Sequence, residues 1–139
     1  MTREVFVDTS ALYAIHDRDD ERHTDAAAIW NALLDEIDQG ATRCRTHSSI
    51  VVEASALIQR RLGVDALADL HYATLDVIQV AWVDGPLHDR ALSAVLAARK
   101  RDVSLVDWTS FEFMKSEHIG TAFAFDSDFA DQGFVLLQR

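Results

Sequence analysis

The stretch "VFVDTSALYA" (residues 5–14) decides the fold, because in it an apolar run passes through an acid directly into a helical pattern. Residues 5–7 are continuously apolar, which is typical of a strand buried on both faces of a parallel sheet. Asp8 follows, and "DTSALYAIHD" (residues 8–17) has the spacing of a helix. A buried strand that leads directly into a helix predicts the first unit of an α/β fold.

The rest of the chain repeats this alternation of short apolar runs and longer amphipathic stretches. Strands that alternate with helices predict a parallel sheet covered by helices on both faces. We expect strands at residues 4–8, 42–47, 77–83, 121–126 and 134–138. We expect helices in "DAAAIWNALLDEI" ended by Gly40, "SSIVVEASALIQRRLG" with serine caps and Gly63, "DALADLHYATLD", "PLHDRALSAVLAARKR" opened by Pro86, and "DWTSFEFMKSE" with Asp107 and Thr109 as candidate caps.

The overall composition indicates a globular protein with a substantial core. The chain has 139 residues, of which 49% are hydrophobic, so we expect one domain over residues 1–139. It contains no apolar run long enough to span a membrane, and its N-terminus does not read as a signal peptide. The single cysteine, Cys44, permits no internal disulfide and fits a cytoplasmic location, with a thiol buried in a strand.

Acids follow or interrupt apolar stretches at four places in the sequence. Asp8 and Asp126 end predicted strands, Asp107 follows the apolar "VSLV", and Glu53 interrupts an apolar helix. Taken singly, Asp8 and Asp107 are equally well explained as helix caps, and Asp128 as a surface acid. Since parallel strands point their carboxyl ends to one edge of a sheet, where ligands bind, the four acids together predict a shared pocket.

Several carboxylates in one pocket require a positive charge, because like charges that lie close together cannot all ionise. A hard divalent cation meets this need, and Mg²⁺ and Mn²⁺ prefer oxygen ligands. Such a site is suited to phosphate chemistry, in which the metal activates water and stabilises charged oxygens. The acids therefore predict a metal-dependent enzyme that acts on phosphate esters.

The four segments resemble a PIN domain, and more closely the VapC branch of toxin–antitoxin ribonucleases. They are "FVDTSALYA", "VVEASALIQRRLG", "SLVDWTSFEFM" and "AFAFDSDFADQGF", in the expected order from residue 5 to about 135. The resemblance implies a PIN-like three-layer α/β/α sandwich with a central, mostly parallel five-stranded sheet. It also implies a cytoplasmic endoribonuclease dependent on Mg²⁺ or Mn²⁺, which forms a homodimer and is inhibited by a small VapB-like antitoxin.

The resemblance also implies the residues of the active site. Asp8, Glu53, Asp107 and Asp126 would form the catalytic acidic pocket. Asp8, Asp107 and Asp126 would hold the metal, while Glu53 would orient or deprotonate the attacking water. Ser10 and Thr109 would support the pocket with hydrogen bonds, and Asp128 would be an outer ligand.

The net charge of −10 argues against a protein that binds nucleic acid through a broad basic face. RNA would have to meet local basic segments, for which the candidates are Arg60 and Arg61 in "QRRLG" and Arg99, Lys100 and Arg101 in "ARKRD". Each segment is explained more simply as a solvated helix end favoured by the helix dipole.

Two other functions stay open from the sequence. One is a non-catalytic interaction module with the same fold, and the other is a phosphoacceptor receiver domain. A receiver needs a lysine at the end of a late strand, and neither Lys100 nor Lys115 is so placed.

The remaining prominent residues are expected to serve structure or assembly. No histidine has the spacing of a metal ligand. We expect the three tryptophans in the core or an interface rather than as base-stacking platforms. Apolar surface for a dimer is expected from "ALADLHYATL" and from Trp30, Leu33, Leu34 and Ile37.

Overall fold

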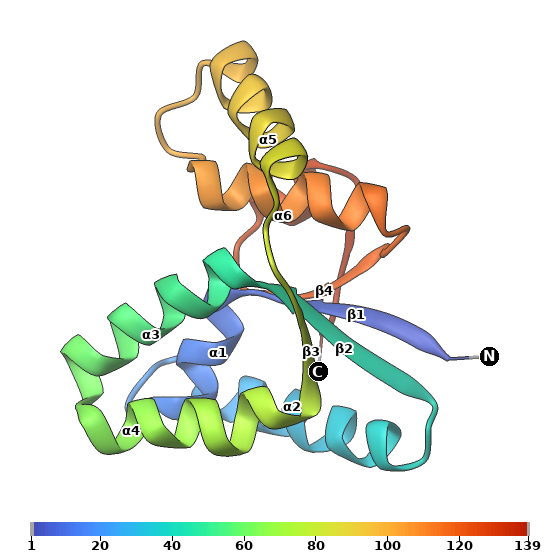
Figure 1. The fold of residues 1–139 in the computed structure, drawn as a ribbon. Helices are drawn as coiled ribbons and strands as arrows, with labels where there is room; N and C mark the ends of the chain where they lie inside the picture. The colour runs from blue at the N-terminus through green and yellow to red at the C-terminus, as the bar shows by residue number, and fades with distance from the viewer. Residues whose placement is uncertain (1, 139) are drawn as a thin grey trace.

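A computed structural model describes residues 2–138 and contains a five-stranded, fully parallel sheet with the strand order β3-β2-β1-β4-β5. Figure 1 shows α2 and α6 on opposite sides of this sheet. The predicted α/β architecture with a central parallel sheet is thereby confirmed. The strands are β1 (Arg3–Val7), β2 (Thr42–His47), β3 (Ile78–Ala81), β4 (Thr121–Phe123) and β5 (Val135–Leu136).

In the described part of the chain, seven α-helices connect and cover the strands. A π-helical turn (Leu70–Thr74) and a 3₁₀ turn (Leu75–Val77) join α4 to β3. None of the helices within residues 2–138 is long and apolar enough to cross a bilayer. The α-helices are α1 (Thr9–His16), α2 (His23–Asp38), α3 (Ser48–Leu62), α4 (Val64–Asp69), α5 (Gly85–Ala98), α6 (Leu105–Ser116) and α7 (Asp128–Asp131).

The core forms around β1, whose residues Val5, Phe6 and Val7 are fully buried. Phe6 packs against the rings of His47, Phe113 and Phe129, which come from β2, α6 and α7. The buried thiol of Cys44 in β2 is confirmed. Burial of β1 on both faces explains its uninterrupted apolar sequence, and it fixes the point at which Asp8 leaves the sheet.

Three strands are shorter than the sequence predicted, and side-chain hydrogen bonds explain two of the ends. The N–H of Phe125 donates to Oγ of Ser10 at 3.0 Å instead of to a neighbouring strand, so β4 ends at Phe123 and Asp126 lies beyond it. The N–H of Val83 donates to Oγ of Ser48 at 2.9 Å, beyond the end of β3. Strand β5 is limited to Val135–Leu136.

The predicted helix starts need two corrections. Helix α6 begins at Leu105 with Ser104 as its N-cap, so neither Asp107 nor Thr109 caps it, and the apolar run before Asp107 is not a strand. Asp107 and Ser104 instead form a reciprocal capping box. Helix α3 has His47 at its N-cap position without a side-chain cap, because the predicted serine caps lie inside the helix.

The prediction that α2 offers an apolar surface for a dimer is largely wrong. Trp30 is 7% exposed and Leu33 is 1% exposed, because both side chains pack into the core of their own chain. Leu34 and Ile37 are partly buried against the same core. The face of α2 that the sequence assigned to a partner therefore covers the chain's own sheet.

Candidate active site

Asp8 lies at the carboxyl end of β1 and is 6% exposed. Its backbone N–H donates to the carbonyl of Phe123 at 3.1 Å, which joins it to β4. Its Oδ2 accepts the N–H of Ser10 at 3.1 Å and the hydroxyl of Ser10 at 2.7 Å. Asp8 is therefore both the N-cap of α1 and a rigidly held acid at the edge of the sheet.

Burial raises the pKa of Asp8 from 3.8 to about 6. The two hydrogen bonds from Ser10 oppose this rise in pKa, whereas the negative charges of Asp107 and Glu53 add to it. The influence of both acids indicates that they lie within electrostatic range of Asp8. A buried carboxylate with acidic neighbours is stabilised in its charged form by a cation.

Asp107, Asp126 and Asp128 form a compact group of carboxylates at the same edge. Each offers one oxygen, and these oxygens all lie within 4.8 Å of one another. Asp126 and Asp128 are joined at the start of α7, where the N–H of Asp128 donates to Oδ1 of Asp126 at 2.9 Å. The Asp107 side chain is fixed by the N–H of Ser104, which donates to its Oδ2 at 2.9 Å.

The raised pKa values in this group indicate that a cation would stabilise its carboxylates in their charged form. Burial and then the charge of Asp126 raise the pKa of Asp128 to about 6, with further contributions from Asp107 and Asp102. Burial also raises the pKa of Asp107, partly offset by its hydrogen bonds with Ser104, and Asp126 raises it further. Three half-buried carboxylate oxygens so close together fit a hard divalent cation.

Asp128 therefore lies closer to the other acids than its expected place as an outer ligand suggested. The sequence offers a signal for this arrangement, because Asp126 and Asp128 in "DSD" flank one residue at a turn. Ser104 was missed as the residue that holds Asp107. Its signal is the spacing of a capping box, a serine followed three residues later by an acid.

Glu53 lies on the first half of α3 and is exposed. It lines a shallow hollow whose other walls come from the start of α3, the end of β3 and the start of α6. Its charge contributes to the raised pKa of Asp8, so its carboxylate lies within electrostatic range of Asp8. Glu53 is thus a solvated acid beside the pocket, placed where it can reach water. The hollow is lined by Ser48, Ser49, Val52, Glu53, Trp82 and Val106.

Thr109 does not support the pocket as expected. Its hydroxyl donates to the carbonyl of Leu105 at 2.7 Å, one turn earlier in α6, and its side chain is buried. Ser10 has the supporting hydrogen bond that was expected of it, because its hydroxyl contacts Asp8 directly.

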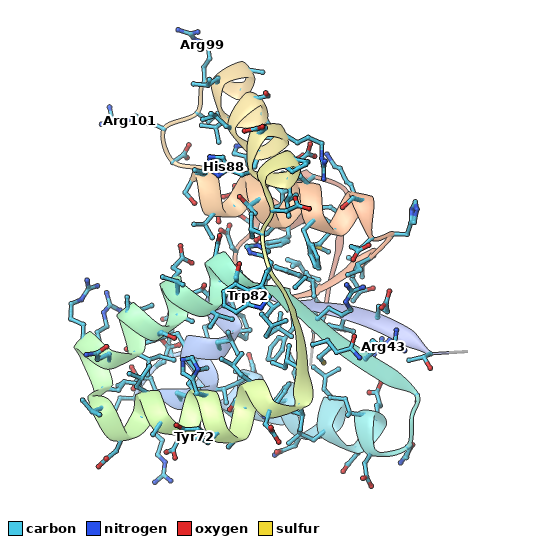
Figure 2. The ribbon with its side chains drawn as sticks, viewed as in Figure 1. Arg43, Tyr72, Trp82, His88, Arg99 and Arg101 are labelled. Carbon is cyan, nitrogen blue, oxygen red and sulfur yellow. The ribbon has the colours of Figure 1, made fainter. Side chains whose placement is uncertain are left out.

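The basic candidates lie on two separate exposed segments. Arg60 and Arg61 are in the last turn of α3, and the guanidinium of Arg61 lies 5.5 Å from the centre of the Tyr13 ring. Arg99, Lys100 and Arg101 are in the loop between α5 and α6, and Figure 2 shows Arg99 and Arg101 extending away from the helices. This loop leads into Ser104 and Asp107, so its cations are close in sequence to the acidic group.

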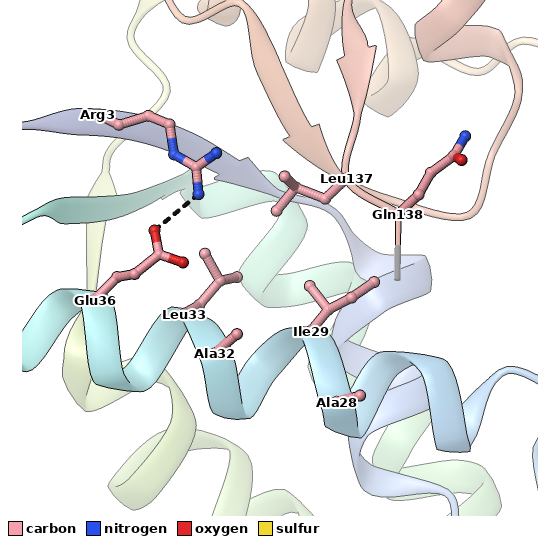
Figure 3. Close-up of a pocket in the computed structure, with 8 residues that line it drawn as sticks. All are labelled: Arg3, Ala28, Ile29, Ala32, Leu33, Glu36, Leu137 and Gln138. Carbon is pink, nitrogen blue, oxygen red and sulfur yellow. Dashed lines mark hydrogen bonds and ion pairs between the residues drawn. The ribbon is translucent and has the colours of Figure 1, made fainter.

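A second hollow, between α2 and the C-terminal segment, does not resemble an active site (Figure 3). Its walls are mainly apolar, from Ile29, Leu33 and Leu137. Its one acid, Glu36, pairs with Arg3 at 2.9 Å. The acids at the carboxyl edge remain the better candidate.

Comparisons with known proteins identify the family of the chain. The family model for the PIN domain matches residues 5–135. The chain is 32% identical over 134 residues to the 23S rRNA-specific endonuclease VapC20 of Mycobacterium tuberculosis, covering 94% of this chain and 95% of that protein.

Solved structures of similar fold include a VapC toxin and two other proteins. The crystal structure of VapC20 from Mycobacterium tuberculosis, described as a sarcin–ricin loop cleaving toxin, has a TM-score of 0.83 and 30% identity, and covers 97% of this chain and 99% of its own. VapBC2 from Rickettsia felis bound to a promoter DNA fragment has a TM-score of 0.69 at 9% identity, covering 96% and 97%. FitAcB from Neisseria gonorrhoeae has a TM-score of 0.67 at 14% identity, covering 96% of each chain. The last two are similar in fold alone.

Proposed function

This chain belongs to the PIN-domain family, and on that premise we propose that it is a divalent-metal-dependent endoribonuclease and the toxin of a VapBC-type toxin–antitoxin pair. The observation that carries the proposal is the acidic edge of the sheet. There the carboxylate oxygens of Asp107, Asp126 and Asp128 lie within 4.8 Å of one another, and the buried Asp8 is within electrostatic range of Asp107.

The donor set fits Mg²⁺ or Mn²⁺. All of its ligand atoms are carboxylate oxygens, and these two ions prefer such ligands. Asp107, Asp126 and Asp128 would hold the ion, and Asp8 would add negative charge from the buried side. When bound, the ion supplies stabilisation of charge on the phosphate oxygens and lowers the pKa of water.

The other side chains have roles that follow from their positions. Ser10 holds the Asp8 carboxylate in one orientation through its hydroxyl. Ser104 does the same for Asp107 through its backbone N–H. Glu53, which is exposed and within electrostatic range of Asp8, would accept a proton from the water that attacks the phosphate.

The substrate we propose is a ribosomal RNA. The support is the similarity over nearly the whole chain to a 23S rRNA-specific endonuclease. The loop cations Arg99, Lys100 and Arg101 would contact phosphates near the acidic group, as expected from the sequence.

We further propose a cytoplasmic complex with a small VapB-like antitoxin, and a homodimer. Since the apolar face of α2 is buried in the chain itself, the dimer contact needs another surface. Helix α5 presents Leu92, 40% exposed, and Leu96, 63% exposed, which would supply apolar area for a two-fold contact. Light scattering of the protein and of Leu96→Glu tests this: a dimer that becomes a monomer supports it.

Cleavage of ribosomal RNA by the purified protein tests the enzymatic proposal. We expect cleavage with Mn²⁺ or Mg²⁺ and none with EDTA. Binding of RNA or antitoxin without cleavage under any of these conditions would instead indicate the non-catalytic interaction module.

A further inference from the structure

The indole ring of Trp82 is 84% exposed, in contrast to the other two tryptophans. Trp30 is buried, and Trp108 is half-buried with its ring against Phe111. We expected the tryptophans in the core or an interface, and the exposure of Trp82 excludes the core for this residue, while an interface stays a prediction. Figure 2 shows its side chain beside the end of β3, at the start of the segment that leads to α5.

The backbone at Trp82 is held in place, and it lies at the same edge of the sheet as the acids. It directly follows β3, whose carboxyl end points the same way as those of β1 and β4 because the sheet is fully parallel. The next residue, Val83, is tied to Ser48 of α3 by a 2.9 Å hydrogen bond. A large ring on a fixed backbone loses little conformational entropy when it binds a ligand.

The ring shares the hollow described above with Glu53 and with Val106, the residue before Asp107. The described residues place no other aromatic ring or guanidinium against Trp82. The lining of the hollow therefore includes both a candidate catalytic acid and an open aromatic ring.

We propose that Trp82 stacks on an unpaired nucleobase of the RNA, next to the nucleotide at the acidic site; this rests on the proposed ribonuclease function. Stacking is independent of charge and so suits a protein with a net charge of −10, whose acidic edge repels phosphates. Every base has a π face, and aromatic rings bind single-stranded segments in this way.

A protein partner fits this hollow less well than a base does. Glu53 is a charged residue in its lining, and Ser48 and Ser49 are polar, whereas the centres of protein interfaces are depleted in charge. The apolar side chains of the lining are Trp82, Val52 and Val106, so the one aromatic ring of the hollow lies in the same lining as a carboxylate.

Tryptophan fluorescence on adding a short single-stranded RNA, in Ca²⁺ or EDTA, tests stacking without requiring cleavage. We expect quenching in the wild type that is lost in Trp82→Leu. Because the Trp82 variants lack the reporting ring, affinities are compared by the fluorescence anisotropy of a labelled RNA, and we expect the Kd of Trp82→Leu to be raised about tenfold or more, since Leu keeps apolar area but has no π face. Trp82→Phe should retain most of the affinity. Tyr72→Leu is the matched control, because Tyr72 is 85% exposed on the π-helical turn after α4.

The outcomes separate this inference from the proposed function. If the wild type binds RNA with Trp82-dependent quenching but never cleaves it, the stacking role stands and the ribonuclease function fails. If Trp82→Leu binds and cleaves like the wild type, the stacking role is overturned, whatever the function. A change of oligomeric state in Trp82→Leu, with RNA affinity per folded chain unchanged, would likewise overturn it and identify a protein contact.

Discussion

The hydroxyl of Ser10 lies 2.7 Å from Oδ2 of Asp8, and its oxygen also accepts the N–H of Phe125 at 3.0 Å. One side chain therefore links the acid that follows β1 to the chain that leaves β4. The second contact ends β4 and turns the following residues out of the sheet, toward Asp126 and Asp128. A single hydroxyl thus brings together the two halves of the candidate site.

Ser10→Ala is expected to slow RNA cleavage and to shift its pH dependence. The hydrogen bonds of Ser10 lower the pKa of Asp8, so removing the hydroxyl should raise that pKa above about 6. The acidic limb of a single-turnover pH–rate profile should then move to higher pH. Ser10→Thr keeps the hydroxyl and is the control. An unchanged acidic limb would show that Asp8 does not depend on this contact.

Asp8→Asn is expected to stabilise the metal-free protein above pH 6. Between pH 3.8 and about 6 the folded state holds the Asp8 proton more tightly than the unfolded state, so stability falls as pH rises through this window. The full cost is about 3 kcal/mol, and Asn, which also caps helices well, avoids it. Urea unfolding in EDTA should give a gain at pH 7.5 and almost none at pH 3.5. Marked destabilisation at pH 7.5 would mean that Asp8 is chiefly a structural cap.

His47 should titrate in the opposite sense. It is fully buried, its Nε2 lies 2.8 Å from Oγ of Ser110, and burial lowers its pKa to about 4. Since the unfolded histidine binds its proton near pH 6.5, stability is lost as pH falls from 6.5 to 4, by about 3 kcal/mol. In the wild type, the stability that Asp8 gains as pH falls offsets the stability that His47 loses. Asp8→Asn removes this offset, so its free energy of unfolding should fall more steeply on acidification than that of the wild type. Adding His47→Phe should flatten that dependence; equal slopes in all three proteins would contradict this account.

Mg²⁺ or Mn²⁺ should raise the melting temperature, because an ion that binds only the folded state stabilises it. Asp126→Asn and Asp128→Asn should reduce this shift to a similar degree, since both carboxylates belong to the compact group. Asp38→Asn, an exposed acid at the end of α2, is the control and should keep the full shift. A full shift in Asp128→Asn would return Asp128 to the outer position expected from the sequence.

Arg101→Gln should weaken RNA binding and flatten its salt dependence. Each lost phosphate contact lowers the slope of log K against log salt by about 0.7 for single-stranded RNA. Arg43→Gln is the control, because it removes the same charge at a different place. Arg43 lies near the amino end of β2, opposite the acidic edge. Equal effects of the two substitutions would mean that only net charge matters.

Much of the fold could be predicted from the sequence because its signals are local. Residues 5–7 are all apolar, as burial on both faces of a parallel sheet requires. Pro86 lies in the first turn of α5, where proline is favoured. The edge of the sheet that carries the acids follows from strand direction. The ends of β3 and β4 could not be predicted, because contacts with Ser48 and Ser10, distant in sequence, determine them.

The candidate site was predicted in its residue types and less well in its geometry. In the sequence, Asp107 follows an apolar run. In the structure, Ser104 is the N-cap of α6, so the residues just before Asp107 form the first turn of that helix. The burial of Trp30 and the exposure of Trp82 depend on which face of each element meets the sheet, and periodicity within a single element does not encode this.

Single-turnover cleavage of ribosomal RNA by the wild type and by Asp126→Asn, with Asp38→Asn as the control, tests the metal-nuclease account most directly. We predict that the wild type and Asp38→Asn cleave with Mn²⁺ and stop in EDTA, while Asp126→Asn is at least about 100-fold slower at equal folded concentration. Cleavage by Asp126→Asn at a rate close to that of the wild type, or cleavage that persists in EDTA, would contradict it.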